Sequence, residues 1–255
     1  MARINIRFLS KSLYRKTEVN LILPSLDLHG SMREQSPDYY RENGQKYPLL
    51  VLLSGFSDDD EGWLANSDIV ALCDRYRVAA ALVGGENRWY VDSGPMDRWH
   101  AYLCEELPDF LYGNFSKLDR GCQILGGVSM GGYGALYNGL KCPQSYSAIM
   151  ALSPALKPDG YIDEGAVGTL KDLFLSARGK LPPVYLSVGD RDFIYGQSAE
   201  FNGWLRENGT GAEYRFVEGY DHSWALWKLE IVRFLEFLKQ KNIIGQDGNA
   251  GKNNF

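Results

Sequence analysis

One serine stands in a setting that favours a catalytic nucleophile. Residues 127–131 read Gly-Val-Ser-Met-Gly, a G-x-S-x-G motif that follows an apolar strand pattern and precedes a helical pattern. A nucleophile at the end of a strand has to turn sharply into the next helix, so side chains two residues away on either side would collide. Gly127 and Gly131 remove those side chains. We therefore predict that Ser129 exposes its hydroxyl at this turn.

The same glycine-rich turn allows a second interpretation, a phosphate-binding loop that contains an incidental serine. Residues 127–131 lack the G-x-G-x-x-G spacing, and no Lys-Ser or Lys-Thr pair of a P-loop follows them. The spacing therefore favours the nucleophile. In that interpretation the backbone amide of Met130, at the start of the helix, points at the oxyanion that develops during acyl transfer.

A serine nucleophile needs a base, and the chain has three histidines. His29 lies in a polar stretch and His100 opens a helical pattern, and neither is assigned a role. Only His222 follows Ser129, between the last strand pattern and the last helical pattern. Because the order serine, acid, histidine is typical of α/β hydrolases, we predict that His222 is the base.

The acid that orients the histidine is expected after the strand pattern at residues 184–188. Two carboxylates follow it. Asp192 lies further into the loop, where it can reach the histidine, whereas Asp190 sits at the strand end and is suited to capping the turn. Asp221 is adjacent to His222 in sequence, which places it badly for the far ring nitrogen. We predict Asp192 as the acid and keep Asp190 as the alternative.

The substrate side of the site is less sharply defined. A second oxyanion amide is expected after the first buried strand, where residues 53–57 read Leu-Ser-Gly-Phe-Ser, and we predict the amide of Phe56. Aromatic residues crowd this edge, and we expect Trp89 and Trp224 to line the substrate pocket. Residues 58–61 form an acidic run that is expected to be a solvated loop, with calcium binding as the alternative. No metal and no cofactor are predicted.

Alternating strand and helix patterns must position these residues. They predict an α/β fold with a mainly parallel sheet, helices on both faces and at most a small cap insert at residues 156–181. The chain is read as one domain, 1–244, with a disordered tail, 245–255. Expected strands are 4–9, 17–23, 49–53, 78–83, 122–128, 148–152, 184–188 and 213–218, and expected helices are 62–76, 99–111, 199–208, 224–241 and one starting at Met130.

Composition excludes several classes of protein. The 255-residue chain has 45% hydrophobic residues and a net charge of −5, which are globular values and disfavour nucleic acid as a partner. No apolar run is long enough for a membrane span. The four cysteines form no CxxC pair and are read as free thiols, and with no signal sequence the expected location is the cytoplasm.

The chain resembles α/β hydrolases of the esterase D and tributyrin-esterase group, which includes S-formylglutathione hydrolases and feruloyl and acetyl esterases. The resemblance covers roughly residues 15–240, and its marks are residues 53–56, 86–92, 105–108, 127–135, 189–195 and 222–224. It implies that Ser129, His222 and Asp192 are nucleophile, base and acid. It also implies oxyanion amides at Phe56 and Met130, and hydrolysis of short-chain carboxylic esters without a cofactor.

Three other activities compete with a carboxylesterase. A thioesterase of the S-formylglutathione type is disfavoured because residues 131–134 read Gly-Gly-Tyr-Gly where that subgroup has Gly-Gly-His-Gly. An acyltransferase would use the same three residues, and a non-catalytic binding module would need none of them. The substrate is expected to be a small ester. Its identity and the oligomeric state, a homo-oligomer included, are left open by the sequence.

Overall fold

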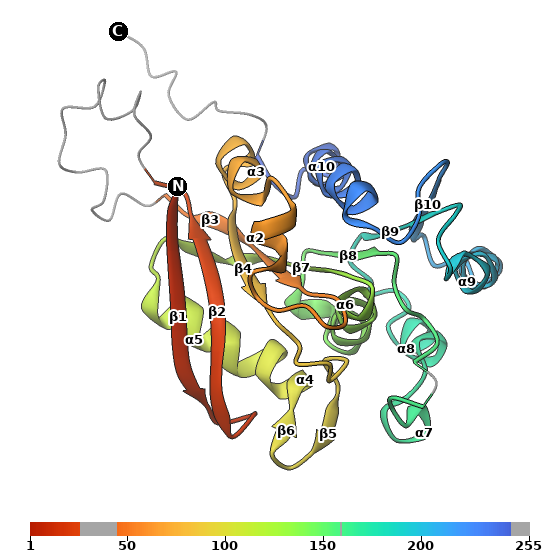
Figure 1. The fold of residues 1–255 in the computed structure, drawn as a ribbon, viewed down its shortest axis with the longest axis horizontal. Helices are drawn as coiled ribbons and strands as arrows, with labels where there is room; N and C mark the ends of the chain where they lie inside the picture. Colours follow the sequence, from red (N-terminus) through yellow and green to blue (C-terminus); the bar gives the residue numbers. More distant parts are fainter. Residues whose placement is uncertain (26–44, 159, 246–255) are drawn as a thin grey trace, which may run out of the picture.

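A computed structural model describes residues 1–25, 45–158 and 160–245 (Figure 1). Its core is an eight-stranded sheet. The strands, in sheet order, are β1 (Ala2–Ser10), β2 (Arg15–Leu23), β4 (Ala79–Val83), β3 (Tyr47–Leu53), β7 (Leu118–Val128), β8 (Ala148–Leu152), β9 (Val184–Gly189) and β10 (Glu213–Val217). The first two pairings are antiparallel and the others parallel. The mainly parallel sheet is confirmed. His29, most of the polar stretch around it and nearly all of the expected tail lie outside the described residues.

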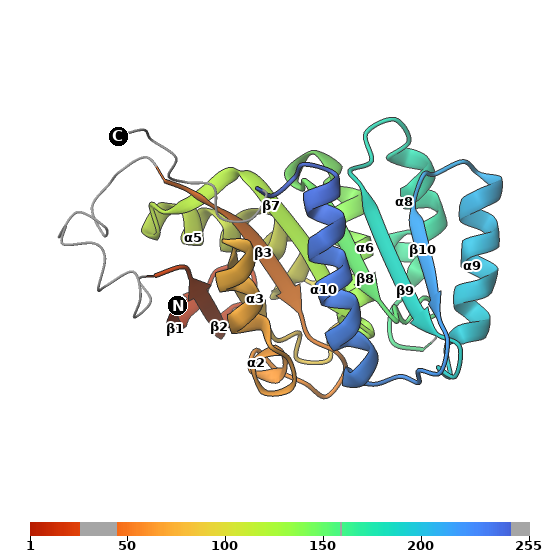
Figure 2. The same ribbon diagram turned by 90° about the horizontal axis from the view of Figure 1, so that it is seen from above.

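Burial explains why the strand patterns differ along the chain. β1 alternates exposed and covered positions, whereas every residue of β4 and β8 is buried. Central parallel strands are covered by helices on both faces and therefore carry continuous apolar runs. The covering helices are α3 (Ile69–Tyr76) and α10 (Trp224–Gln240) on one face, and α5 (Leu107–Asn114), α6 (Met130–Lys141) and α8 (Leu170–Ser176) on the other (Figure 2).

Two predicted helices differ from the structure. The expected helix at 62–76 is divided into α2 (Gly62–Asn66) and α3, because Ser67 adopts an extended conformation. The Ser67 hydroxyl accepts a hydrogen bond from the amide of Ile69 at 3.3 Å and replaces the helical partner there. The expected helix at 199–208 begins earlier, as α9 (Tyr195–Glu207).

The expected helix at 99–111 contains a wide, π-helical turn at Tyr102–Glu106 between α4 (Trp99–Ala101) and α5. Pro108 lies just after this turn and has no amide hydrogen to donate, which disfavours regular α-helical bonding there. Just before α4, β5 (Asp92–Gly94) and β6 (Asp97–Arg98) form a small hairpin that the sequence patterns did not predict.

The segment between β8 and β9 is a small insert, as expected. It holds α7 (Glu164–Val167) and α8, and its Tyr161 ring contacts both Phe56 and Trp89. These contacts bring the insert to the loops that hold Phe56 and Trp89, which follow strands β3 and β4. In the described part of the chain, no helix is long and apolar enough to cross a bilayer.

Candidate active site

The residues predicted to do chemistry meet at the carboxyl edge of the parallel strands. Ser129 lies between β7 and α6, Asp192 follows β9, and His222 lies just before α10. Carboxyl ends of neighbouring parallel strands share one edge, so loops far apart in sequence converge there. Ring nitrogen Nε2 of His222 lies 3.0 Å from the Ser129 hydroxyl oxygen, and Nδ1 lies 3.0 and 2.9 Å from the two carboxylate oxygens of Asp192.

The backbone at Ser129 is strained, with φ 55° and ψ −117°. A Cβ atom on Gly127 would lie 2.3 Å from the carbonyl oxygen of Gly131, and one on Gly131 would lie 2.4 Å from that of Leu53. Both positions therefore require glycine, because the neighbouring backbone lies too close to leave room for a side chain. The surrounding structure holds the strained turn, because the Ser129 amide donates to the Leu152 carbonyl at 2.9 Å.

The two candidate acids have different partners. Asp192 is buried, and its Oδ1 also accepts a hydrogen bond from the amide of Ile194 at 3.0 Å. Asp190 accepts from the amide of Gly219 at 2.7 Å and so joins the loop after β9 to the loop that carries His222. Asp221 is exposed. Of the three carboxylates, Asp192 contacts the imidazole, whereas Asp190 connects two loops through its hydrogen bond to Gly219.

The backbone at both predicted oxyanion amides flanks the serine. The position of a Cβ on Gly55, the residue before Phe56, is 3.6 Å from Cβ of Ser129. Met130 follows the serine and opens α6. Among the residues that the structure describes, neither the Phe56 nor the Met130 amide donates to a protein acceptor. Two unsatisfied donors beside a candidate nucleophile are suited to a developing negative charge.

A buried tyrosine supports the loop that carries Phe56. The Tyr90 hydroxyl lies 3.0 Å from the Ser54 carbonyl oxygen and 3.1 Å from the Val83 carbonyl oxygen. Its ring fills space left by two glycines, since a Cβ on Gly85 or Gly134 would come within 2.4 or 2.5 Å of it. Burial raises the pKa of Tyr90 well above its ordinary value, so the hydroxyl stays protonated and remains a donor.

The segment that carries Tyr90 holds the same loop at a second point. The amide of Ser57 donates to the side-chain oxygen of Asn87 at 2.7 Å. Four residues of this segment adopt positive φ angles: Glu86 (47°), Asn87 (59°), Trp89 (55°) and Tyr90 (59°). Such a run costs free energy and persists only where surrounding contacts impose it. The strained segment thus fixes the position of the Phe56 loop.

The two residues predicted to line the substrate pocket, Trp89 and Trp224, have different surroundings. Trp89 is buried, with its ring centroid 5.5 Å from that of Tyr133 and 5.4 Å from that of Tyr161. It lines a cavity of about 420 Å³ together with Asn87, Arg88, Val91, Asp92, Ser93, Tyr161, Ile162, Asp163, Ala166 and Val167. Trp224 instead packs against Trp63 and Trp227, with centroid separations of 5.1 Å in both pairs. Trp89 thus lines a cavity and Trp224 packs against two other indole rings, and which of them contacts a substrate stays a prediction.

Two aromatic rings contact the histidine, and neither belongs to the residues that we predicted to bind the substrate. The Phe193 ring is 81% exposed, and its centroid lies 4.6 Å from that of the His222 imidazole. The Trp227 ring meets the same imidazole edge-on at 5.1 Å. Phe193 directly follows Asp192. Its adjacency to the acid was the available signal, because a loop that brings a carboxylate to the imidazole also brings the next side chain close.

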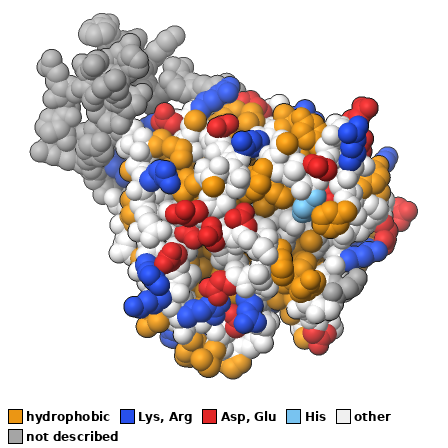
Figure 3. All heavy atoms as spheres, viewed as in Figure 1, with side chains coloured by type: hydrophobic (Ala, Val, Ile, Leu, Met, Phe, Trp, Pro, Cys, Tyr) orange, Lys and Arg blue, Asp and Glu red, His pale blue; other side chains and the backbone are white. Residues whose placement is uncertain are grey.

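The acidic run at 58–61 is solvated only in part, since Asp59 and Glu61 are exposed and the other two residues are not. Asp60 is only 9% exposed and accepts from the side-chain amide of Asn20 at 2.7 Å. Burial raises the pKa of Asp58 and of Asp60. Figure 3 shows acidic side chains (red) gathered over this part of the molecule, near α2 and β2. Within the described residues, the only group of three or more His, Cys, Asp or Glu side chains close enough to share a metal ion lies elsewhere and consists of His100, Cys104 and Cys142.

Residues 10–238 match the Esterase family model, described as "Putative esterase". An acetyl esterase of Caldicellulosiruptor saccharolyticus is 29% identical over 270 residues, which cover 94% of this chain and 99% of that protein. An S-formylglutathione hydrolase of Paracoccus denitrificans is 30% identical over 222 residues, 70% of this chain and 77% of that protein.

Solved structures agree on the fold. An S-formylglutathione hydrolase from Staphylococcus aureus superposes with a TM-score of 0.80 at 19% identity, covering 93% of this chain and 98% of that one. A ferulic acid esterase superposes with a TM-score of 0.74 at 20% identity, covering 94% and 97%. The expected α/β-hydrolase fold is confirmed by these matches.

Proposed function

This chain belongs to the esterase family, and on that premise we propose that it is a serine carboxylesterase that hydrolyses short-chain acyl esters, acetyl esters above all. One observation carries the proposal. The hydroxyl of Ser129, the imidazole of His222 and the carboxylate of Asp192 form a continuous chain of hydrogen-bond distances between 2.9 and 3.0 Å. That chain links a nucleophile, a base and an acid that stabilises the charged base.

In the proposed acylation step, Ser129 attacks the ester carbonyl carbon while Nε2 of His222 takes the hydroxyl proton. Asp192 stabilises the resulting imidazolium and keeps Nδ1 protonated. The amides of Phe56 and Met130 donate to the oxyanion, and one such donor is worth about 3–4 kcal/mol in the transition state. When the tetrahedral intermediate collapses, His222 returns the proton to the leaving alcohol.

In the deacylation step, water replaces the alcohol. His222 removes a proton from this water as it attacks the acyl-serine carbonyl, and the same two amides bind the second oxyanion. Collapse releases the carboxylic acid and returns the proton to Ser129.

The preference for short acyl groups rests on the openness of the site. Aromatic rings beside the serine loop lie at the surface, with Phe56 45% and Tyr161 64% exposed. A longer acyl chain gains binding free energy only when its added methylenes leave water, at about 0.8 kcal/mol for each fully buried one. Rings as exposed as these bury few of them. The acetyl esterase relative, which aligns with nearly the whole chain, supports the same preference.

The test compares p-nitrophenyl esters of increasing acyl length, with S-formylglutathione as a competing substrate. We expect kcat/KM to be highest for the acetyl ester and to fall with acyl length, and a fluorophosphonate probe to label Ser129. Ser129→Ala should lose labelling and turnover, whereas Ser176→Ala, an exposed serine on α8, keeps both. Preferred turnover of S-formylglutathione would replace the ester proposal with a thioesterase. Wild-type turnover in Ser129→Ala would contradict both the ester and the thioesterase proposal.

A further inference from the structure

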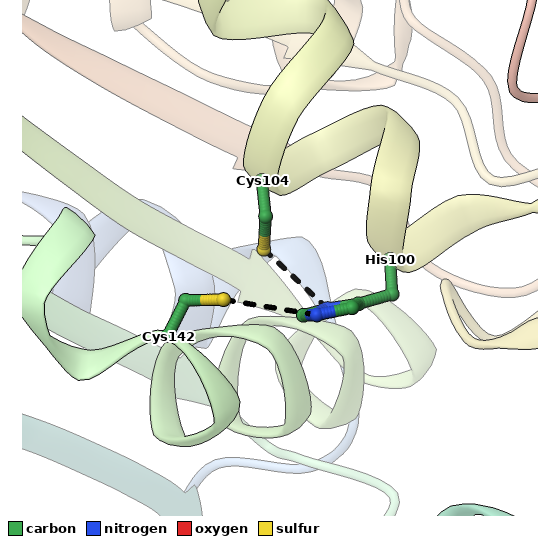
Figure 4. Close-up of side chains that lie close together, drawn as sticks. All are labelled: His100, Cys104 and Cys142. Carbon is green, nitrogen blue, oxygen red and sulfur yellow. Dashed lines mark hydrogen bonds between the residues drawn. The ribbon is translucent and has the colours of Figure 1, made fainter.

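A second cluster of reactive side chains lies outside the proposed esterase machinery. His100, Cys104 and Cys142 point toward one another (Figure 4). Sγ of Cys104 lies 3.4 Å from Nδ1 of His100, and Sγ of Cys142 lies 3.7 Å from Nε2. One ligand atom from each residue lies within 4.8 Å of the other two, and all three side chains are partly buried rather than sealed in the core.

Two helical segments bring the cluster together. His100 and Cys104 are four residues apart on the continuous helical stretch from α4 into the π-helical turn, so they share one face. Cys142 directly follows the last residue of α6. The expected helix at 99–111 already placed His100 and Cys104 on one face, but the packing of this stretch against the end of α6 adds the third side chain.

A neighbouring amide fixes the orientation of the imidazole. The side-chain nitrogen of Asn138 donates to the carbonyl oxygens of Tyr90 and Gly134, at 2.9 and 2.8 Å, so its oxygen has to face His100. That oxygen lies 2.8 Å from Nδ1. Because an amide oxygen only accepts hydrogen bonds, Nδ1 carries a proton. Nε2 of a neutral ring then presents its lone pair toward Cys142.

This arrangement has the features of a metal-binding histidine. A ligating histidine usually donates its other ring N–H to a fixed acceptor, which here is the oxygen of Asn138. In a tetrahedral zinc site, metal–sulfur and metal–nitrogen bonds of standard length separate the sulfur and nitrogen atoms by about 3.6 Å. The observed separation between Sγ of Cys142 and Nε2 of His100 is 3.7 Å. Sγ of Cys104 lies 3.4 Å from Nδ1, so this side chain has to turn toward Nε2 to reach the same ion.

From this geometry we propose that Nε2 of His100 and the sulfur atoms of Cys104 and Cys142 bind a thiophilic divalent cation, Zn²⁺ in the first place. Thiolate and imidazole ligands select zinc over magnesium or calcium, which prefer oxygen. Three protein ligands leave the fourth tetrahedral position to water. The bound ion would tie the α4 stretch to the end of α6, and it takes no part in the proposed ester hydrolysis.

The experiment uses the reduced, chelator-treated full chain and Co²⁺ as the spectroscopic probe. We expect one Co²⁺ per chain and a sulfur-to-cobalt charge-transfer band, which Zn²⁺ abolishes by displacement. Cys142→Ser should weaken Co²⁺ affinity at least about 100-fold and Cys104→Ser similarly, because each removes a thiolate ligand. Cys122→Ser is the matched control, since this buried cysteine lies outside the cluster, and it should leave the affinity and the band unchanged.

An independent measurement covers the case in which a variant fails to fold. In the wild-type chain, saturating Zn²⁺ should protect Cys104 and Cys142 from alkylation, as located by peptide mass spectrometry, without changing the other two cysteines. Absence of a charge-transfer band in the reduced wild type would overturn the proposal. So would a Cys142→Ser variant that binds Co²⁺ as tightly as the wild type and with an undiminished band, or a Cys104–Cys142 disulfide that forms readily while the reduced chain binds no Co²⁺.

Discussion

Two histidine-centred clusters in this molecule have the same outline and different partners. His222 has a carboxylate at Nδ1, with both oxygens of Asp192 within 3.0 Å, and His100 has the amide oxygen of Asn138 there, at 2.8 Å. At Nε2, His222 faces the Ser129 hydroxyl at 3.0 Å, and His100 faces a thiol sulfur at 3.7 Å.

The partner at Nδ1 decides what each ring is suited to do. A carboxylate stabilises a charged imidazolium, so His222 can accept a proton during a reaction and hold it until the leaving group takes it. A neutral amide oxygen at Nδ1 fixes the tautomer, so the neutral ring of His100 has its lone pair at Nε2. The comparison predicts a proton carrier in one cluster and a ligand in the other.

The largest effect should come from removing each ring in turn. His222→Ala should lower kcat for p-nitrophenyl acetate by about 10⁶-fold, because Ser129 loses its base. His100→Gln should lower kcat by less than about 10-fold, since its contacts run to Asn138 and the two thiols. Steady-state kinetics of both variants measure this. Comparable losses in the two would contradict the division of roles.

Replacing the carboxylate of Asp192 by an amide gives His222 the kind of Nδ1 partner that His100 has. Asp192→Asn should lower kcat by about 10⁴-fold, because an amide supports the wrong tautomer of His222 and does not stabilise its charge. Asp190→Asn is the control: its remaining carbonyl oxygen still accepts from Gly219, and kcat should stay within about 3-fold. The proposed acid is wrong if Asp190→Asn proves the more damaging of the two.

Tyr90 lies between the clusters, since its carbonyl accepts from Asn138 and its hydroxyl donates near the Phe56 loop. Tyr90→Phe should destabilise the fold by about 1–3 kcal/mol and lower kcat about 10-fold, as the Ser54 carbonyl loses its buried donor. Tyr185→Phe also removes a buried hydroxyl bond, to Glu230, but should leave kcat unchanged.

Urea unfolding and steady-state kinetics of both tyrosine variants separate stability from catalysis. Equal falls in kcat would mean that general loosening of the fold, and not support of the Phe56 loop, is responsible.

The smallest effect concerns thiol reactivity in the metal-free chain. Hydrogen bonding with Cys104 and then with His100, whose Nε2 lone pair can take the thiol proton, lowers the pKa of Cys142 to about 5, whereas burial raises the pKa of Cys122. Alkylation requires the thiolate, so Cys142 should keep reacting as the pH falls from 9 to 6 and slow only near pH 5. Cys122 should slow throughout that range. Peptide mass spectrometry after brief iodoacetamide treatment measures both residues, and parallel pH profiles would contradict the assignment.

Local patterns predicted the elements better than the breaks within them. β8 has the expected bounds, and β9 extends only one residue further, because uninterrupted apolar runs mark strands that are covered on both faces. The break at Ser67 was missed, since it depends on a side chain competing with the backbone for one hydrogen bond. The wide turn before Pro108 was missed as well, although the proline was the signal that indicated it.

In the candidate site, too, some residues were predictable from the sequence and some contacts were not. Chain order and motif spacing were enough to single out Ser129, His222 and Asp192, because a tight strand-to-helix turn restricts which residues can flank a nucleophile. The sequence could not say that Trp224 turns toward Trp63, or that the Phe193 ring meets the imidazole. Those contacts depend on the angles at which helices and loops pack.

By itself, then, the sequence determined the chemistry of the turn at residues 127–131, where steric exclusion acts over a few neighbouring residues. Only the tertiary structure decided that Cys142 meets His100 and Cys104, and that Tyr90 supports the loop of Phe56. Spacing along the chain carries no information about such meetings, because they are set by the packing of elements that lie 30 or more residues apart.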